Sequence, residues 1–256
     1  MLLVIDIGNS NIVAGCFEGD RLVYHLRLHT DSHRTADEYE SLLFGLLERN
    51  LPDGFVFNAC VISSVVPPLT QEIMRLIARR TEITPLIVGP GIKTGMSIKT
   101  ADPSAVGADR VVNALAAREL YGRPVLAIDF GTATSFDYVD ACGDYQGGII
   151  APGLSIALDS LVEHTAKLPR IELVWPERVV GKSTVEAMQS GTVIGYLALV
   201  DGLIERVKRE VAAIDCVVAT GGLGELISRE SAHINYYDPL LTLKGMKILA
   251  GVNGVY

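Results

Sequence analysis

No dense run of basic residues occurs in this 256-residue sequence, and its formal net charge is −8. Nucleic-acid phosphates are held by clustered Lys and Arg, so we expect no nucleic acid partner. Long hydrophobic runs are absent too, because charged residues or glycine interrupt the apolar stretches and the apolar start of the chain ends at Asp6. We therefore expect no membrane span and no secretory leader, which predicts a cytoplasmic protein.

Cysteine and histidine are few and follow no pattern. The four cysteines have no C-x-x-C spacing, and the five histidines form no cluster with metal-ligand spacing. This argues against a disulfide framework and a zinc centre, and favours reduced cysteines in the core. The pattern G-x-x-x-x-G-K-[ST], which holds phosphates in many nucleotide-binding proteins, is also missing.

An internal repeat is the first positive signal. Leu2–Gly8 lines up with Val125–Gly131, because each is an apolar run that ends in an Asp and a Gly, and each is followed by a β-rich run and a turn. Cys60–Ser64 resembles Cys216–Thr220 in the same order along the chain. Chance similarity between apolar strands is the alternative, but two ordered matches favour a duplication.

Helical patterns separate the predicted strands. Apolar residues recur with helical spacing in residues 36–50 and 68–80, and Asp102-Pro103 is typical of the start of a helix that ends near Tyr121. A Ser-x-x-Glu box at Ser183 opens a long helix that reaches about Ala213, with glycines that would let another helix pack closely. The alternation predicts an α/β protein with two halves, residues 1–121 and 122–256.

Two of the predicted strands end in loops suited to phosphate. In Asp6-Ile7-Gly8-Asn9-Ser10-Asn11 the Gly allows a sharp turn, the small polar residues suit phosphate oxygens, and the Asp suits a hydrated Mg²⁺. Asp129-Phe130-Gly131-Thr132 repeats this pattern. A plain hairpin turn explains the first loop equally well by itself, so the pairing of the two loops carries the prediction of a triphosphate site.

Two further motifs each have two interpretations. Ala219–Gly224, after a third buried strand, is either a plain strand-to-helix turn or a backbone surface for adenine and ribose. Gly107-Ala108-Asp109-Arg110 lies near a helix start. It is either a surface ion pair that complements the helix dipole, or a general base beside a guanidinium that binds a carboxylate or phosphate.

Seven motifs, in order along residues 1 to about 250, together resemble the type III pantothenate kinases of the actin-like ATPase, or acetate and sugar kinase, superfamily. They are Asp6-x-Gly8-Asn9, Ile62–Pro68, Gly89–Gly95, Gly107–Arg110, Asp129–Thr132, Gly147–Gly153 and Ala187–Gly191. Single motifs recur across the superfamily, whereas the combination is specific to the family.

The resemblance implies two actin-like ATPase domains of the ribonuclease H-like kind, each a mixed β-sheet flanked by helices, with ATP in the cleft between them. It implies transfer of the γ-phosphoryl group of ATP to the 4′-hydroxyl of pantothenate, the first step of coenzyme A biosynthesis. It also implies Mg²⁺, a potassium or ammonium ion, and a homodimer with the helix of residues 183–213 at its interface.

The resemblance assigns roles to residues as well. Asp109 is expected to be the general base, Asp129 to bind the monovalent cation, and Asp6 to lie near Mg²⁺. The expected pantothenate site consists of Gly107, Ala108, Asp109, Arg110 and Thr184. The expected ATP contacts are Asp6, Ile7, Gly8, Asn9, Ser10, Asn11, Ile12, Val13 and Thr132.

This chain departs from the family pattern before Gly107. Where the family often has Arg-Tyr-Asp-Asn-Pro, residues 99–103 are Lys-Thr-Ala-Asp-Pro, so Thr100 stands where an aromatic substrate contact often sits. Two alternative functions stay open. One is a kinase or phosphatase of the same superfamily with another small substrate, and the other is a nucleotide-binding accessory protein without turnover. The presence of Asp109 and Asp129 favours an enzyme.

Overall fold

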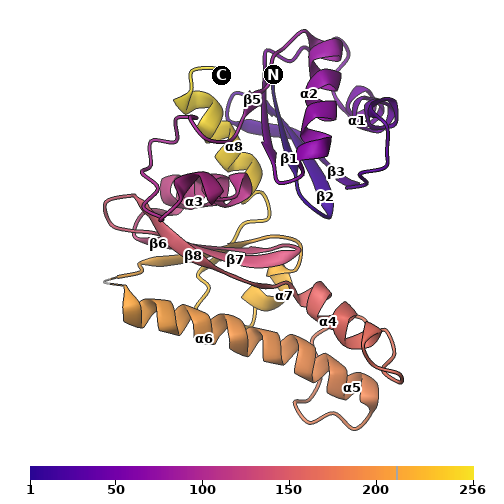
Figure 1. Ribbon diagram of the computed structural model, residues 1–256, viewed down its shortest axis with the longest axis vertical. Coiled ribbons are helices and arrows are strands. Elements are labelled where there is room, and N and C mark those ends of the chain that lie inside the picture. Colours follow the sequence, from indigo (N-terminus) through magenta and orange to yellow (C-terminus); the bar gives the residue numbers. More distant parts are fainter. Residues whose placement is uncertain (212) are drawn as a thin grey trace. The chain divides into compact units, whose positions relative to one another are not determined.

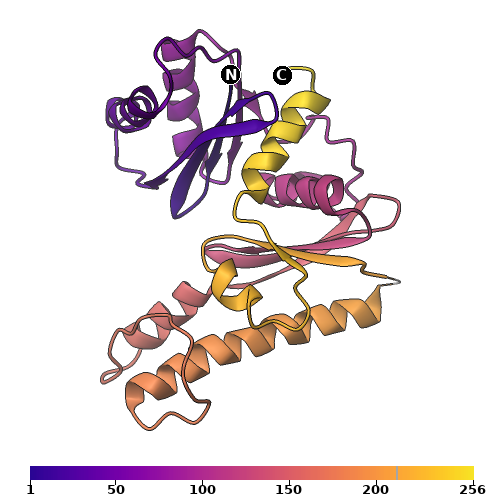
Figure 2. The ribbon, with the colours of Figure 1, turned by 180° about the vertical axis from the view of Figure 1, so that it is seen from behind.

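The computed structural model describes residues 1–211 and 213–256, which form two compact units (Figures 1 and 2). The first comprises residues 1–97, 101–116 and 240–256, and the second comprises residues 98–100 and 117–239. The C-terminal residues therefore belong to the first unit, although the sequence predicted a simple division at residue 121. The division at residue 121 stays a proposal about where one duplicated half of the sequence ends and the other begins.

A five-stranded mixed sheet forms the centre of the first unit, in the order β3-β2-β1-β4-β5. Its strands are β1 (Leu2–Ile7), β2 (Asn11–Glu18), β3 (Arg21–His29), β4 (Ala59–Ser64) and β5 (Leu86–Ile87). The first three strands are antiparallel neighbours, whereas β1, β4 and β5 run parallel. Strands β1, β2 and β4, which the apolar runs of the sequence predicted, are confirmed.

The sheet of the second unit repeats this topology, in the order β8-β7-β6-β9-β10. Its strands are β6 (Val125–Phe130), β7 (Ala133–Val139), β8 (Tyr145–Pro152), β9 (Cys216–Thr220) and β10 (Tyr236–Tyr237). Even the register agrees: Asp6 of β1 is paired with Ser63 of β4, and Asp129 of β6 is paired with Thr220 of β9. Each unit thus places an acid beside a hydroxyl at the carboxyl end of its central parallel strands.

Helices cover both faces of the first sheet (Figure 1). Helices α1 (Ala36–Asn50) and α2 (Pro67–Thr81) bury Tyr39 and Ile73 against the alternate β1 side chains that include Ile5. Helix α8 (Leu241–Val252) packs against β1, β4 and β2. Because successive strand residues point to opposite faces, β1 needs apolar residues at nearly every position, as its sequence shows.

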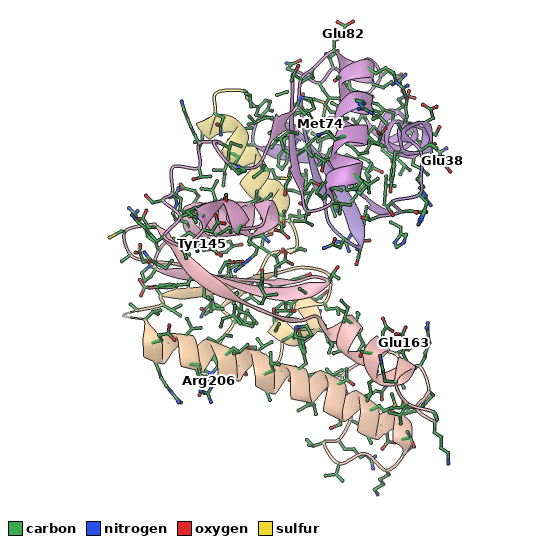
Figure 3. All side chains as sticks on the ribbon, in the orientation of Figure 1. Glu38, Met74, Glu82, Tyr145, Glu163 and Arg206 are labelled. Atoms are coloured by element: carbon green, nitrogen blue, oxygen red, sulfur yellow. The ribbon has the colours of Figure 1, made fainter. Side chains whose placement is uncertain are left out.

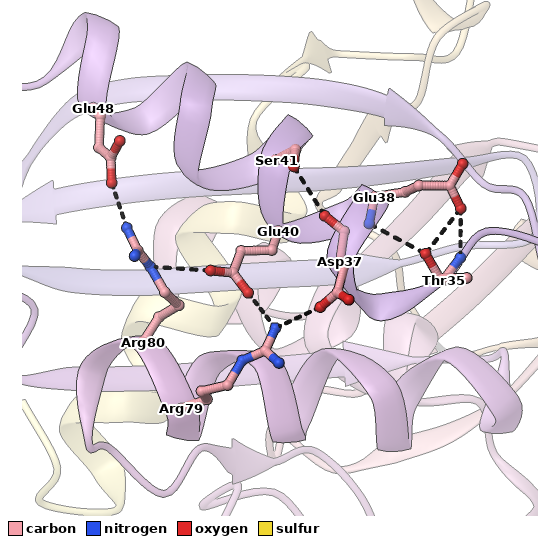
Figure 4. Close-up of polar contacts among 8 residues, drawn as sticks. All are labelled: Thr35, Asp37, Glu38, Glu40, Ser41, Glu48, Arg79 and Arg80. Carbon is pink, nitrogen blue, oxygen red and sulfur yellow. Dashed lines mark hydrogen bonds and ion pairs between the residues drawn. The ribbon is translucent and has the colours of Figure 1, made fainter.

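An ion-pair network joins α1 to α2 at the surface (Figure 4). Arg79 binds Asp37 at 2.9 Å and also Glu40, while Arg80 binds Glu48 and lies over the ring of Phe44 at 5.0 Å. Single exposed ion pairs contribute little, but a connected set fixes the relative orientation of two helices more firmly. This network holds the two helices together on their shared face of the sheet.

In the second unit, one long helix covers the sheet. It consists of α5 (Thr184–Gln189), one π-helical turn (Ser190–Ile194) and α6 (Gly195–Glu210). Val193, Tyr196, Val200 and Ile204 are buried against the sheet, whereas Arg206 points away from it (Figure 3). Helices α4 (Leu154–Glu163) and α7 (Gly224–Ser228) complete the unit.

This helix corrects the expectation that no segment suits a membrane. By length and composition, Thr184–Glu210 is long and apolar enough to cross one, with a mean hydropathy of 1.3 in its most apolar window. A core helix passes the same test, and the buried stripe on α6 packs within the unit. The glycines in this helix do not break it, so the apolar residues on both sides of them belong to one continuous helix.

Most predicted helix boundaries are confirmed. Helix α1 has the predicted bounds, and α2 extends the prediction by one residue at each end. Asp102 caps only a short 3₁₀ turn (Pro103–Ala105), and α3 (Ala108–Tyr121) starts after a break at Gly107. The long helix ends at Glu210 rather than near Ala213, and residue 212 lies outside the described residues.

Two local predictions were partly wrong. Ser183 Oγ accepts the N–H of Glu186 at 3.2 Å, but the Glu186 carboxylate accepts the N–H of Lys182 instead of completing the box on Ser183. All four cysteines are free, yet Cys142 is exposed in the turn between β7 and β8, so only the other three are core residues. Burial raises the pKa of the Cys16 thiol to about 12, which keeps that thiol protonated.

Candidate active site

The loop between β1 and β2 holds the first group of predicted site residues. The N–H of Gly8 donates to the carbonyl of Asn11 at 3.0 Å, which closes the loop tightly. Asn9 and Ser10 are exposed at its tip, and Asp6 is partly exposed at the end of β1. The loop therefore presents small polar side chains and backbone N–H groups to solvent beside one carboxylate, which suits an anion with a bound cation.

Two of the expected nucleotide contacts point the other way. The side chains of Ile7 and Ile12 are buried in the core of the first unit. Only their backbone is left to meet a ligand. The sequence alone did not distinguish backbone from side-chain contacts at these positions, because apolar residues at a loop edge suit both.

The loop between β6 and β7 is the second group. The N–H of Gly131 donates to the carbonyl of Ala133 at 3.1 Å, as Gly8 does in the first unit. A Cβ at Gly153 would collide with the carbonyl oxygen of Thr132 and would lie 2.7 Å from that of Gly131. The start of α4 therefore packs directly against the Thr132 loop at Gly153, where there is no room for a side chain.

Asp129 lies against a second glycine. Gly221 has a φ of +93°, and a Cβ there would lie 2.6 Å from the Asp129 carboxylate. This positive φ favours glycine, and the close approach excludes larger residues. The Ala219–Gly224 segment is a tight strand-to-helix turn, closed by a bond from the N–H of Gly224 to the carbonyl of Gly221 at 3.1 Å.

Asp109 lies in the first turn of α3. Its carboxylate accepts the backbone N–H of Arg110 at 2.8 Å, and a Cβ on Gly107 would lie only 2.6 Å from it. Burial raises the pKa of the Asp109 carboxyl above its usual range, against the lowering effect of the Arg110 N–H and guanidinium. A raised pKa makes this carboxylate a better proton acceptor than an exposed aspartate.

The remaining expected substrate residues are Gly107, Ala108, Arg110 and Thr184. The first three flank Asp109 and are partly buried in the first unit. Thr184 is exposed at the first position of α5, in the second unit. The structure thus brings Gly107–Arg110 together, and it also groups Asp6–Val13, whereas Asp129, Thr132 and Thr184 belong to the other unit.

The donor set fits a magnesium ion better than a metal held by the protein alone. Among the described residues there is no group of three or more His, Cys, Asp or Glu side chains that could hold a metal. Mg²⁺ in phosphoryl-transfer sites takes one or two carboxylates together with phosphate oxygens and water. Asp6, a single aspartate near the end of β1, would be sufficient for such an arrangement.

Two surface hollows lie elsewhere in the first unit. They have volumes of about 490 and 390 Å³ and are lined by residues of α1, Arg34 and Arg80. Neither hollow contains a predicted site residue.

Sequence reasoning missed the residues that support these loops. Gly153 and Gly221 stood within recognised motifs, but nothing in the sequence showed which backbone atoms they approach. Thr30, which follows β3, belongs to no motif, yet its hydroxyl donates to the carbonyl of Gly8 at 2.7 Å. That contact joins residues 22 positions apart and depends on how β3 pairs with β2.

Comparison with known proteins shows close relatives. Residues 2–206 match the family model described as type III pantothenate kinase. The chain is 46% identical to the type III pantothenate kinase of Bacillus cytotoxicus, over all of this chain and 97% of that protein. It is also 46% identical to the type III pantothenate kinase of an Exiguobacterium species, over 97% of this chain and 98% of that protein.

Solved structures share the fold at lower identity. A Campylobacter jejuni protein, described as a candidate transcriptional activator of the Baf family, has a TM-score of 0.63 at 20% identity, covering 99% of this chain and all of that one. A Sinorhizobium meliloti protein, described as a candidate 2-dehydro-3-deoxygalactonokinase, has a TM-score of 0.58 at 15% identity, covering 98% and 96%. At such identities the likeness concerns the fold alone, which is the predicted actin-like, sugar-kinase α/β fold. The full-length identity and the family model together lead to one conclusion: this chain belongs to the type III pantothenate kinase family.

Proposed function

We propose that this protein transfers the γ-phosphoryl group of ATP to the 4′-hydroxyl of pantothenate, with Asp109 as the general base. Membership of the family makes the protein an ATP-dependent kinase that uses a divalent metal ion. The observation that carries the assignment of Asp109 is its position in the first turn of α3, with a carboxylate whose pKa is raised by burial. Arg110, next to it, supplies a cation for the pantothenate carboxylate.

Phosphoryl transfer depends on position and charge more than on covalent chemistry. Asp109 orients the attacking hydroxyl and accepts its proton as the new bond to phosphorus forms. Gly107, Ala108 and Thr184 complete the proposed pantothenate site. The alternative interpretation of Gly107–Arg110 as a surface ion pair is less favourable, because Asp109 is partly buried and its carboxylate accepts the backbone N–H of Arg110.

We assign nucleotide binding to the loops at the ends of β1 and β6. Asn9 and Ser10 offer exposed polar groups, and Ile7 and Ile12 offer only backbone. Gly8 of the loop and Asn11 and Val13 of β2 are the other proposed contacts. Thr132 is the proposed contact from the second loop. Asp6 would hold Mg²⁺ and Asp129 a potassium or ammonium ion. When bound, these cations offset the negative charge of the phosphates.

The proposal predicts turnover that depends on pantothenate and on a particular monovalent cation. With ATP and Mg²⁺, the purified protein should release ADP only when pantothenate is present, and faster in potassium or ammonium than in sodium. Asp129→Ala should abolish the difference between the cations, because the anionic ligand is lost. Steady-state ADP release in the three chlorides measures both effects.

The outcomes separate the competing functions. Unchanged cation dependence in Asp129→Ala would move the cation site elsewhere. ATP binding without pantothenate-dependent turnover would favour another small substrate, or the nucleotide-binding accessory protein that the sequence left open. Cytoplasmic location and the absence of nucleic acid and membrane partners stay predictions.

A homodimer through the long helix is also part of the proposal. Gly191 and Gly195 are exposed on this helix, and a Cβ on either would meet nothing within 4 Å. Leu199, on the same helical face, is 39% exposed, and Val179 and Val180 of the preceding loop are exposed by 69% and 82%. This open, apolar and small-residue face would allow close helix packing between two copies.

Gly195→Leu should weaken that dimer. A leucine on the open face would hold a second helix away, so sedimentation equilibrium should show a mass shift from two chains toward one. Gly45→Leu, at an exposed position of α1, is the matched control, since a Cβ at Gly45 also meets nothing within 4 Å. A wild-type protein that sediments as one chain at micromolar concentration would refute the proposed dimer.

A further inference from the structure

The segment that follows β3 holds the β1–β2 loop at two points. The hydroxyl of Thr30 donates to the carbonyl of Gly8 at 2.7 Å, and the backbone N–H of Thr30 donates to the carbonyl of Ser10 at 3.0 Å. The second bond continues the ladder between β2 and β3. The first does not, because Gly8 follows β1, which is not a neighbour of β3. One residue thus ties both ends of the loop.

These two bonds decide which way the loop's peptide groups face. A trans peptide is planar, so its carbonyl and the N–H of the next residue point in opposite directions. With the carbonyl of Gly8 turned toward Thr30, the N–H of Asn9 points away from it, whereas Asn11 faces Gly8 within the hairpin, since its carbonyl accepts the Gly8 N–H. The Asn9 N–H, at the exposed tip of the loop, is therefore the donor that this orientation would offer to an anion.

Thr30 is itself firmly anchored. The hydroxyl of Tyr39, in α1, accepts the N–H of Asp31 at 2.8 Å and donates to the carbonyl of Asp31 at 2.9 Å. Tyr39 is fully buried in the core of the first unit. The start of α1 is fixed in turn by a capping box between Thr35 and Glu38. Hydrogen bonds from Tyr39 to Asp31 and from Thr30 to Gly8 thus connect the core of the first unit to the loop.

We propose that Thr30 is a positioning residue for nucleotide binding, which holds the peptide groups of the Gly8–Asn11 loop in the orientation that receives the phosphates of ATP. This inference rests on the proposed nucleotide site and adds to it a residue that touches the loop rather than the ligand. Glycine makes the loop's backbone easy to rotate, so the loop needs an external constraint at Gly8.

Thr30→Val tests the inference, because valine keeps the shape of threonine and removes only the hydroxyl. One neutral hydrogen bond is worth enough that the Kd for ATP in the presence of Mg²⁺ should rise about 3- to 10-fold. The KM for ATP should rise with it, whereas the KM for pantothenate should stay within about twofold. Thr30→Ser, which keeps the hydroxyl, should restore ATP binding. Isothermal titration calorimetry and steady-state kinetics measure these quantities.

Thr81→Val is the matched control. The hydroxyl of Thr81 also donates to a carbonyl at 2.7 Å, that of Ile77 in α2, and it too is partly buried. Both valine variants should lower Tm, but only Thr30→Val should weaken ATP binding. If both variants lose stability alike while the Kd for ATP stays the same, Thr30 has only a structural role and the inference fails.

The test also separates this inference from the proposed function. A wild-type protein that binds ATP but leaves pantothenate unphosphorylated would overturn the proposed substrate, and the effect of Thr30→Val on ATP binding would still stand. An active wild-type protein together with normal ATP binding in Thr30→Val would overturn the role of Thr30 alone.

Discussion

Asp109→Asn should reduce kcat by about 10²–10⁴-fold while leaving the Kd for ATP nearly unchanged, because a positioned general base contributes about that much to a proton-transfer step. The amide keeps the shape of the carboxyl and can still accept the N–H of Arg110, so the first turn of α3 should persist. Single-turnover kinetics with saturating ATP and pantothenate isolate the chemical step from product release.

The same variant should be more stable than the wild type at neutral pH. The pKa of Asp109 is raised in the folded protein, so its stabilising contribution is present in full below the unfolded pKa and is lost as the pH rises through the folded pKa. Burial makes ionisation of this carboxyl more costly in the folded protein than in the unfolded chain, and asparagine removes that cost. The Tm difference between the two proteins should shrink as the pH is lowered through the raised pKa.

Asp53→Asn makes the same chemical change on an exposed residue of the first unit. It should alter neither turnover nor Tm. Normal turnover in Asp109→Asn would remove Asp109 from its proposed role, and a loss of both ATP binding and stability would show that the residue supports the fold instead.

Gly153→Ala should damage both stability and nucleotide binding. The backbone of Gly153 is not strained, with φ −68°, so the effect is purely steric. The added methyl would collide with the carbonyl oxygen of Thr132 and approach that of Gly131. Backbone atoms have no alternative rotamer, so the loop or the start of α4 must move, at a cost of about 1–3 kcal/mol.

For a chain of this length that cost should lower Tm by roughly 2–12 °C. The Kd for ATP should rise as well, because Thr132 moves with its loop. Gly45→Ala is the opposite control: Gly45 is exposed within α1 and its Cβ would meet nothing, so alanine should stabilise the helix by about 0.5–1 kcal/mol. Equal Tm values for Gly153→Ala and the wild type would contradict the steric argument.

The repeated parts of the fold could be predicted from sequence because their physics is local. An apolar run that ends in Asp and Gly gives a buried strand and a turn in both units, and the structure confirms β1 and β6 in equivalent places. Helix α1 matched its predicted bounds because its capping box and its apolar spacing agree. The pattern around Asp102-Pro103 predicted that Asp109 lies near a helix start, and α3 does begin at Ala108.

What the sequence did not show depends on contacts between distant residues. The hydroxyl of Thr30 can reach the carbonyl of Gly8 only when β3 is paired with β2. The close contact between Gly153 and the carbonyl of Thr132 depends on how α4 follows β8. The pKa of Asp109 depends on burial, which no spacing rule reports. The long helix at residues 184–210 was predicted, but its continuity through the glycines was not, because glycine is costly in isolated helices.

The position of helix α8 affects the order in which the protein can fold during its synthesis. The helix follows the whole second sheet along the chain, yet it packs on β1, β2 and β4, which are made early. Its buried residues cover an apolar face of the first sheet; they are Leu241, Leu243, Gly245, Met246, Leu249 and Ala250. Chains usually fold from the N-terminus as they leave the ribosome. Here the first sheet cannot be covered until the residues after β10 are made, so a chain without them would carry an uncovered sheet and be an early target for chaperones and proteases.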